Sequence, residues 1–368
     1  MSERSNEIGL GCYKKPIGLV PSKVRILVPA YKKMMNMKKN NTFDEIWSKL
    51  KSAERVIMSL HDGPDGDGLG SCTAMKYVLE KHLGLKVILI SPDNLDGVLM
   101  DLPFCKEVEF GKKFEDLSVN KEDILLFLDS GEISYYKNPK KEGMIKGRFV
   151  INMDHHITNT FYGNLNYVDV NQPSACSILV DFFRKKNINF DRELSKRLLL
   201  GICTDSGFFK HGNVNKSLKD ALFLIENGAD YTNDIINPIL NNQPLKMKRY
   251  YALLINNLKV NKRKRFAYSS IAYRDIKKLG LNLAEVRLGP GHLNDIKELD
   301  FIFTLAEMED HIKGSFRSKV NIDVSLFAKA LSGGGHRAAA AFRLPKMSLK
   351  KAENKVIKTI GKVGINRY

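Results

Sequence analysis

The stretch Val56-Ile57-Met58-Ser59-Leu60-His61-Asp62-Gly63-Pro64-Asp65-Gly66-Asp67-Gly68 decides how the rest of the sequence is interpreted. Its first five residues form an apolar run that is typical of a buried strand, and Thr73 to Glu80 has the spacing of a helix with an apolar face. His61, Asp65 and Asp67 are therefore expected in the turn between a strand and a helix. In open α/β sheets, ligands bind at such carboxyl ends of strands.

The chemistry of this turn favours a metal ion. Carboxylates held this close together repel one another unless a cation lies among them. The glycines between them allow the backbone to turn tightly. An alternative interpretation is a polar turn whose aspartates cap the following helix. Capping would explain one aspartate but not the whole set.

Further apolar runs, typical of strands, alternate with predicted helices, and they cover Lys86–Ile90, Ile124–Leu128 and Phe149–Met153. Polar groups follow two of them, as Asp129-Ser130 and as Asp154-His155-His156. Thr204-Asp205 follows a predicted helix over Leu194–Cys203. Helices between short buried strands indicate an α/β fold with a mostly parallel, doubly wound sheet, in which these groups converge on one edge.

The length of 368 residues suggests two domains. We expect a basic, irregular extension over residues 1–42, a catalytic domain over 43–230, a polar linker over 231–245 and a smaller basic α/β domain over 246–368, with a cleft between the domains. Thr42 is expected to cap the first helix. The extension is either a nucleic-acid-binding arm or an artefact of an upstream start codon.

The net charge of +18 is distributed unevenly. Residues 1–42 carry +7, residues 43–245 carry −5 and residues 246–368 carry +16. A basic domain beside an acidic metal site suits a polyanionic substrate such as a nucleotide or a short nucleic acid. The alternative is that the lysines are simply solvated side chains of a generally basic protein.

The five cysteines are scattered without a CxxC pair, which argues against a zinc knuckle or a disulfide framework and indicates a reducing compartment. No apolar run approaches the roughly 20 residues of a membrane helix, and the N-terminus lacks the apolar core of a secretory signal. We therefore expect a cytoplasmic protein without a membrane segment.

Five motifs occur in a fixed order: His61-x-x-Pro64-Asp65-x-Asp67, Leu128-Asp129-Ser130, Asp154-His155-His156, Thr204-Asp205 and Gly333-Gly334-Gly335-His336. Over roughly residues 45–345 they resemble the DHH phosphoesterase superfamily with its DHH-associated C-terminal domain. The sequence is most similar to the nanoRNase/pAp-phosphatase branch. The resemblance implies Mn²⁺-dependent hydrolysis of short oligoribonucleotides or small nucleotides, such as pApA or pAp, by a metal-activated water.

The resemblance also implies the site residues. One Mn²⁺ would be held by His61, Asp65 and Asp129, and the other by Asp67, Asp129, His155 and Asp205. Mixed imidazole and carboxylate ligation suits Mn²⁺, with Mg²⁺ or Co²⁺ as substitutes. Asp129, Asp154 and His156 would be catalytic, because Asp154 would orient a histidine and His156 would face the substrate. Asp154 and His156 could instead be purely structural.

In the C-terminal domain, the resemblance assigns binding of the nucleotide, away from the scissile bond, to Arg317, Gly333, Gly334, Gly335 and His336. A bidentate arginine and a glycine loop with free N–H groups suit a phosphate, although the loop could be only a tight turn. The sequence departs from the family pattern at Gly68, where alanine is usual, and at Ala341, where glycine is usual. The second departure bears on the nucleotide preference.

Several alternatives stay open at this point. A cyclic-dinucleotide phosphodiesterase, a RecJ-like single-strand exonuclease and a polyphosphatase or pyrophosphatase belong to the same superfamily. A non-catalytic nucleic-acid-binding protein on the same scaffold is an alternative from another class. The expected partners are a short RNA or a small nucleotide, and the chain is a possible homodimer.

Overall fold

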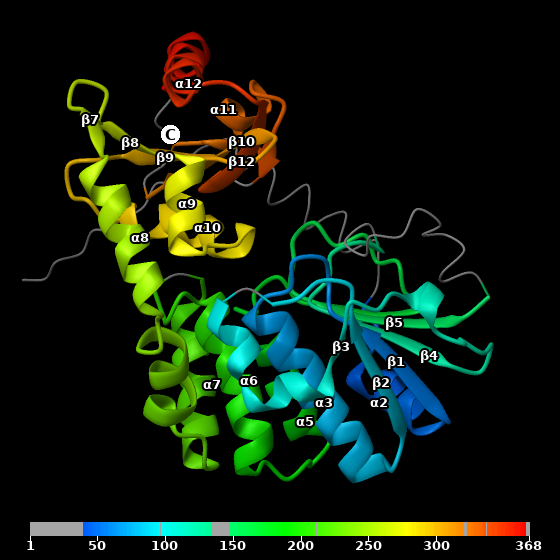
Figure 1. The fold of residues 1–368 in the computed structure, drawn as a ribbon. Coiled ribbons are helices and arrows are strands. Elements are labelled where there is room, and N and C mark those ends of the chain that lie inside the picture. The colour runs from blue at the N-terminus through cyan, green and yellow to red at the C-terminus, as the bar shows by residue number, and fades with distance from the viewer. Residues whose placement is uncertain are drawn as a thin grey trace, which may run out of the picture. The chain divides into compact units, whose positions relative to one another are not determined.

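The computed structural model describes residues 40–95, 97–133, 147–210, 212–319, 322–335 and 337–365. Most of the expected basic extension therefore lies outside the described residues. Two lobes follow one another along the chain, each built on a six-stranded sheet (Figure 1). Within the described part, no helix is long and apolar enough to cross a membrane.

The sheet of the N-terminal lobe is entirely parallel, with the order β3-β2-β1-β4-β5-β6. Its strands are β1 (Arg55–Ser59), β2 (Lys86–Ser91), β3 (Glu109–Phe110), β4 (Ile124–Leu128), β5 (Phe149–Asp154) and β6 (Leu165–Val168). The direction of the strand order reverses between β1 and β4. In open α/β sheets, the crevice outside the strand ends at such a switch point binds ligands.

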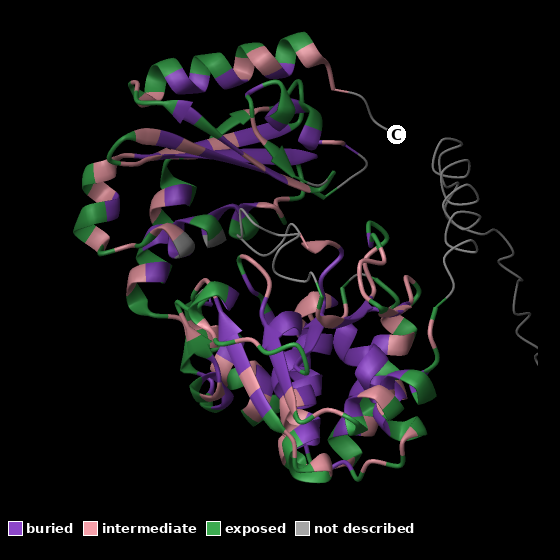
Figure 2. Cartoon of the chain, turned by 90° about the vertical axis from the view of Figure 1, so that its right-hand side faces the viewer, coloured by how far each residue is buried: buried purple, intermediate pink, exposed green. Residues whose placement is uncertain are grey.

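The larger core of this lobe lies between the sheet and the helices α2 (Phe43–Lys51), α3 (Gly66–Leu83), α5 (Ala175–Lys185), α6 (Arg192–Asp205) and α7 (Val214–Glu226). Val56 and Met58 face these helices, whereas Ile57 faces a smaller cluster on the opposite side of the sheet, beside the 3-10 turn η3 (Phe114–Asp116). Buried residues make up most of α3, α5 and α6, whereas α2 and α7 bury only a minority of their residues; Figure 2 shows the buried segments in the interior of the lobe. Two further 3-10 turns, η1 (Gly97–Asp101) and η2 (Pro103–Glu107), precede β3.

Helix α2 begins as the sequence indicates. The Thr42 hydroxyl accepts a hydrogen bond from the N–H of Glu45, and the Glu45 carboxylate accepts one from the N–H of Thr42. This reciprocal capping box satisfies two of the N–H groups that a helix start leaves unpaired.

Helices α3 and α6 pack closely because Gly70 has no side chain. A Cβ atom at Gly70 would lie 2.5 Å from the carbonyl oxygen of Arg197 on α6. The close approach also brings together Asp67, which lies on α3, and Asp205, which ends α6.

The region expected as a linker is folded over most of its length. Residues Tyr231–Leu240 form a π-helix, η5, whose first turn is capped by the Asp230 carboxylate. Ile235 and Ile239, four residues apart, are buried in the core of the N-terminal lobe. The sequence from Leu245 to Asn256 then forms α8. The domain boundaries themselves, and the cleft between the domains, stay predictions.

The C-terminal lobe has a mixed sheet with the order β11-β12-β10-β9-β8-β7, in which only the β8–β9 pair is parallel. The strands are β7 (Lys259–Asn261), β8 (Phe266–Ile271), β9 (Phe301–Glu307), β10 (His311–Ser318), β11 (Gly334–Gly335) and β12 (Ala339–Pro345). This arrangement, together with the parallel first sheet, confirms the expected α/β class with a second, smaller α/β unit.

Helices cover both faces of the second sheet. Buried residues of α11 (Ser325–Lys329) and α12 (Leu349–Val363) pack against phenylalanines such as Phe303 and Phe316. On the other face, α8, α9 (Tyr273–Leu279), α10 (Leu283–Leu288) and the 3-10 turn η6 (Gly289–Leu293) pack against Ala267, Ile302 and Ala306.

The packing of α3 on α6 generates a prediction about stability. Gly70→Ala should lower the free energy of unfolding by about 1–3 kcal/mol, because the added methyl group meets backbone that cannot move without separating the helices. Gly361→Ala is the matched control, since only the Lys264 side chain lies within 4 Å of a Cβ there. That change should stabilise the protein by about 0.5–1 kcal/mol, as alanine favours a helix over glycine.

Equilibrium unfolding in urea measures both variants. Equal stability of Gly70→Ala and the parent protein would show that α3 and α6 are not held at this separation.

Candidate metal centre

The turn after β1 places three potential ligands at the switch point of the first sheet. His61 follows the strand, and Asp65 is the N-cap of α3. One Asp65 carboxylate oxygen accepts hydrogen bonds from the N–H groups of Asp67 and Gly68, both at 3.0 Å. The capping interpretation of the sequence is therefore correct for Asp65. It does not account for His61 or Asp67.

Asp67 is fixed by a segment more than a hundred residues away. Its two carboxylate oxygens accept hydrogen bonds from the N–H groups of Ala175, at 2.6 Å, and Cys176, at 3.0 Å. These groups belong to the first turn of α5, where a carboxylate is favoured by the unpaired N–H groups and the helix dipole. Asp67 is only 1% exposed.

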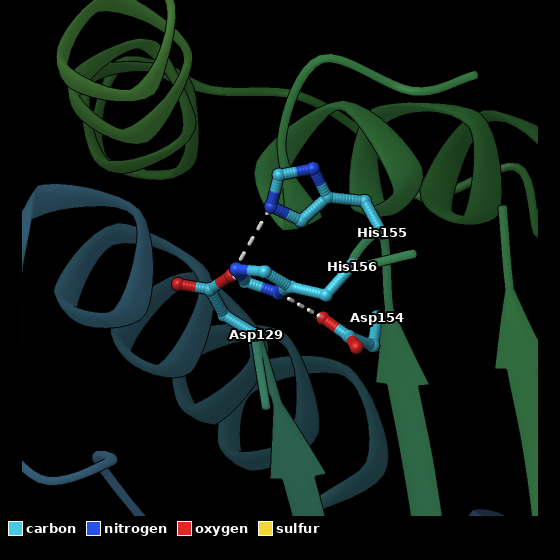
Figure 3. A group of neighbouring side chains, drawn as sticks. All are labelled: Asp129, Asp154, His155 and His156. Atoms are coloured by element: carbon cyan, nitrogen blue, oxygen red, sulfur yellow. Dashed lines mark hydrogen bonds and ion pairs between the residues drawn. The ribbon is translucent and has the colours of Figure 1, made fainter. Parts of the chain in front are cut away.

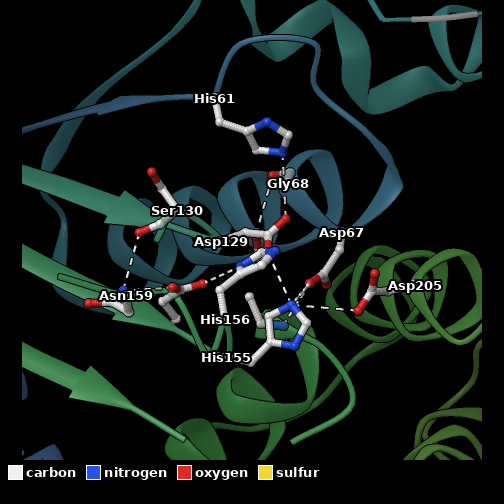
Figure 4. Close-up of polar contacts among 12 residues, drawn as sticks. His61, Asp67, Gly68, Asp129, Ser130, His155, His156, Asn159 and Asp205 are labelled. Carbon is white, nitrogen blue, oxygen red and sulfur yellow. Dashed lines mark hydrogen bonds and ion pairs between the residues drawn. The ribbon is translucent and has the colours of Figure 1, made fainter. Parts of the chain in front are cut away.

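Asp129, directly after β4, has an unusual backbone conformation. Its φ of +54° lies in the left-handed region, where aspartate is more frequent than most non-glycine residues. Its N–H donates to the carbonyl oxygen of Met153 on β5 at 3.2 Å. The conformation turns the chain so that the carboxylate lies between His61 and His155, with oxygen-to-Nε2 distances of 3.6 and 3.3 Å (Figure 4).

The structure brings the sequence-predicted ligands into two neighbouring groups. The first contains His61, Asp65 and Asp129, and the second contains Asp67, His155 and Asp205. The His155 Nε2 atom lies 3.3 Å from Asp129, 3.6 Å from Asp205 and 3.9 Å from Asp67. Figure 4 shows the three carboxylates turned toward this nitrogen.

These distances suit a shared cation better than direct hydrogen bonds. His155 Nε2 and the Asp129 Oδ1 atom are both buried and have no hydrogen-bond partner. Two ligands bound to one divalent ion at about 2.1 Å lie roughly 3–4 Å apart. Carboxylate and imidazole donors also match the chemistry of such ions. The donor set therefore fits divalent metal ions.

The pKa values of the clustered carboxyl groups reflect the crowding of negative charge at this site. Burial and the negative charges of Asp129 and Asp205 raise the pKa of Asp67 well above its ordinary value, despite its two backbone hydrogen bonds. Burial also raises the pKa of Asp205, to about 6. Without metal, the negative cluster favours bound protons, which a divalent cation would displace.

The pKa values of the two histidines are also raised, but by a different cause. Burial alone would lower the pKa of His61 and of His155, but the neighbouring carboxylates, Asp129 foremost, outweigh it. The pKa rises to about 11 for His61 and to about 10 for His155. Burial opposes ionisation of Asp129, yet the same two histidines hold its pKa below the ordinary value.

His156 takes no part in either group of three, but it belongs with Asp129, Asp154 and His155 to a further group whose potential ligand atoms lie within 4.8 Å of one another. Its Nδ1 atom lies 2.8 Å from the carboxylate of Asp154, which is fully buried at the end of β5 (Figure 3). The same nitrogen lies 3.7 Å from Asp129. Asp154 thus orients His156 rather than His155, and it is close enough to raise the pKa of His156 against the effect of burial.

Sequence reasoning missed the amides that hold this region together. The buried Asn159 side chain donates to Asp154 at 2.6 Å and to the Asn152 side-chain oxygen at 2.8 Å. Asn152 in turn donates to the carbonyl oxygen of Ser130 at 3.1 Å and to the Tyr162 hydroxyl at 3.1 Å. The network therefore connects the ends of β4 and β5. The only sequence signal is the position of Asn159 three residues after His156.

The residues expected to bind the nucleotide lie in the C-terminal lobe. Arg317 is on β10, half-buried, and one of its nitrogens donates to the carbonyl oxygen of Phe316 at 2.9 Å. Gly334 and Gly335 form the edge strand β11 and pair with Ala341 and Ala340. Gly335 has a φ of +136°, and a Cβ there would lie 2.6 Å from the Ala339 carbonyl oxygen. His336 lies outside the described residues.

Comparison with protein families agrees with this geometry. Residues 55–202 match the model for the DHH family, N-terminal domain, and residues 264–362 match the model for the DHHA1 domain. The first range begins with β1 and ends in α6, so it includes every ligand of the two groups except Asp205. The second range includes all the strands of the second sheet except β7.

Individual relatives are distant but align over most of their length. A probable bifunctional oligoribonuclease and PAP phosphatase from Streptococcus mutans is 24% identical, over 81% of this chain and 92% of that protein. A bifunctional oligoribonuclease and PAP phosphatase from Thermus thermophilus is 25% identical, over 85% of this chain and 94% of that protein.

Among solved structures, an exopolyphosphatase-related protein from Bacteroides fragilis has a similar fold, with a TM-score of 0.78 at 19% identity. The similarity covers 87% of this chain and 94% of that one. With the two family matches and the cluster of histidines and aspartates, the conclusion is that this chain belongs to the DHH/DHHA1 phosphoesterases and is a hydrolase of phosphoester bonds.

Proposed function

We propose that the protein is a Mn²⁺-dependent phosphoesterase that hydrolyses short oligoribonucleotides and small nucleotides such as pApA and pAp. The observation that carries the proposal is a pair of neighbouring groups of potential ligands: His61, Asp65 and Asp129 at the ends of β1 and β4 and the start of α3, and Asp67, His155 and Asp205 beside them. Two relatives that align with most of this chain are named as oligoribonuclease and PAP phosphatase, and these names support the proposed substrate class.

The proposed ligands of one ion are His61, Asp65 and Asp129, and those of the other are Asp67, Asp129, His155 and Asp205. When bound, a pair of divalent ions activates a water molecule as nucleophile and stabilises the charge of the phosphate. The protein contributes the fixed positions of these side chains. Asp67 is held by the start of α5 and Asp129 by its contact with β5, so neither needs to move during the reaction.

We propose that the His156 side chain contacts the substrate. Its Nδ1 atom is occupied by Asp154, so its Nε2 atom is the one available to the phosphate or the leaving oxygen. A carboxylate partner fixes the orientation of the ring and favours its protonated form. In that form, the ring can donate a proton to the departing oxygen as the bond to phosphorus breaks.

A substrate panel tests the proposal. Purified protein with Mn²⁺ should hydrolyse pAp, pApA and a pentaribonucleotide, with products resolved by chromatography. Preferential cleavage of cyclic di-AMP, pyrophosphate or long single-stranded DNA would instead support one of the related activities. The absence of any Mn²⁺-dependent hydrolysis would contradict the proposal.

Asp129, the proposed ligand of both ions, is the residue whose substitution tests the metal centre most directly. Asp129→Asn keeps the shape of the side chain and removes the charge that both proposed ions use. We expect turnover of pApA to fall by at least about 1,000-fold, as metal-supplied stabilisation is worth several kcal/mol. The rise in melting temperature on adding Mn²⁺ should be lost as well.

Asp181→Asn is the control, because that carboxylate pairs with Lys216 away from the cluster. Near-normal turnover and an unchanged Mn²⁺ effect in Asp129→Asn would remove Asp129 from the centre.

The amide network gives a second prediction. Asn159→Ala leaves a buried oxygen of Asp154 without its 2.6 Å donor, and such a loss typically costs about 1–3 kcal/mol of stability. Because His156 then loses its fixed orientation, kcat for pApA should fall more than KM rises. Steady-state kinetics separate the two parameters, and a change confined to KM would argue against a positioning role.

The C-terminal lobe gives a third prediction. Arg317→Ala should reduce kcat/KM for pApA by roughly 10- to 100-fold, as expected for the loss of a charge-assisted contact. A small artificial diester, bis-p-nitrophenyl phosphate, has no distal nucleotide and should be affected far less. Equal losses on both substrates would mean that Arg317 supports the fold or the metal centre instead.

A further inference from the structure

One face of the second sheet carries a row of cations, of which the proposed function uses only Arg317. Lys313, Ser315 and Arg317 alternate along β10 and therefore point to the same face. Arg343 on β12 pairs directly with Lys313 across the antiparallel strands. We refer to Lys313, Arg317 and Arg343 as the cationic row.

The cationic row lacks compensating acids. Within the described part of the chain, no carboxylate lies within ion-pair distance of any of its three members, although other basic residues of the lobe, such as Lys259 and Arg265, have acidic partners. Asp310 is the acid nearest to Lys313 in sequence; it is exposed, pairs with His311 and interacts electrostatically with Arg343 without forming an ion pair. Lys313 and Arg317 are only partly exposed, so water does not fully replace a partner.

The arrangement is unfavourable in the absence of a ligand. Like charges placed directly opposite each other on neighbouring strands destabilise a sheet. Burial, followed by the positive charges of Arg287, Arg343 and Arg317, lowers the pKa of Lys313. A bound anion would remove both the repulsion and the cost of burying these charges.

The space between the charges is lined by small residues. Ser315 pairs with Ala341 on β12, and Ala341 also pairs with Gly334 on the edge strand β11. The side chains between the two ends of the row are therefore short. Along β10, Arg317 and Lys313 are four residues apart, or about 13 Å at the rise of a strand. A strand segment of this length has room for two phosphate groups, one at each end of the row.

We propose that Lys313 and Arg343 form a second anion subsite. This subsite binds one phosphate of a single-stranded oligonucleotide, while another phosphate, nearer to the scissile bond, contacts Arg317. The inference rests on the proposed function and adds a preference for chain length. A substrate of several nucleotides would engage the whole cationic row, whereas pApA would reach the Arg317 end. The departure at Ala341 belongs to this surface, because its small side chain lies between the two subsites.

The test compares substrates of different length in one double variant. Lys313→Gln with Arg343→Gln should lower kcat/KM for a 5′-phosphorylated pentaadenylate by roughly 10- to 100-fold, the range expected for lost charge-assisted contacts. The loss on pApA should be at least several-fold smaller. The dependence of log kcat/KM on log salt for the pentamer should also become shallower, by about 0.7 for each phosphate contact removed.

Lys355→Gln with Lys358→Gln is the matched control, because it removes two exposed charges from α12, which packs on the opposite face of the sheet. It should change neither the length preference nor the salt dependence.

An equal loss on pApA and the pentamer, or no loss on either, would overturn the second subsite. If the unaltered protein binds Mn²⁺ but cleaves neither substrate, the proposed function fails first, and the two failures are thereby distinguished.

Discussion

The structure depends on holding several carboxylates within a few ångströms of one another. Asp67, Asp129 and Asp205 surround a single nitrogen of His155, and Asp65 and Asp129 approach His61. Such a cluster is stable only if positive charge lies within it, either as protons on the histidines or as bound cations. The raised pKa values of both histidines and of Asp67 express this requirement.

Several features of the N-terminal lobe hold these carboxylates together although their negative charges repel one another. The strand order places the ends of β1 and β4 side by side at the switch point. The first turn of α5 supplies two N–H groups to Asp67, and the left-handed backbone of Asp129 directs its carboxylate inward. Gly70 permits the close packing of α3 on α6, which carry Asp67 and Asp205. All of these features involve the backbone, which thereby fixes the positions of Asp67 and Asp129 and the separation of α3 from α6.

The sequence predicted the elements that carry the ligands because they have strong local signals. The apolar runs that became β1, β2, β4 and β5 are buried on both faces, as parallel strands usually are. Their ends converge for geometric reasons, so His61, Asp129 and His155 could be expected to meet. The structure does bring them together, while their roles as ligands stay predictions.

Other features had no local signal. The edge strands β3 and β6 contain only two and four residues and were not predicted. The asparagines of 231–245 suggested a linker, but the spacing of Ile235 and Ile239 buries one side of a π-helix. The contact of Asp67 with α5 joins residues 108 positions apart, and the role of Asn159 emerges only once β4 and β5 are neighbours. Long-range contacts of this kind cannot be obtained from a local pattern.

The most direct measurement of the central claim is anomalous diffraction at the manganese edge, from crystals grown with Mn²⁺. Two anomalous peaks are expected within about 4 Å of each other. One should lie among His61, Asp65 and Asp129, and the other among Asp67, Asp129, His155 and Asp205. A cluster without anomalous signal at saturating Mn²⁺, or ions bound only elsewhere on the chain, would contradict it.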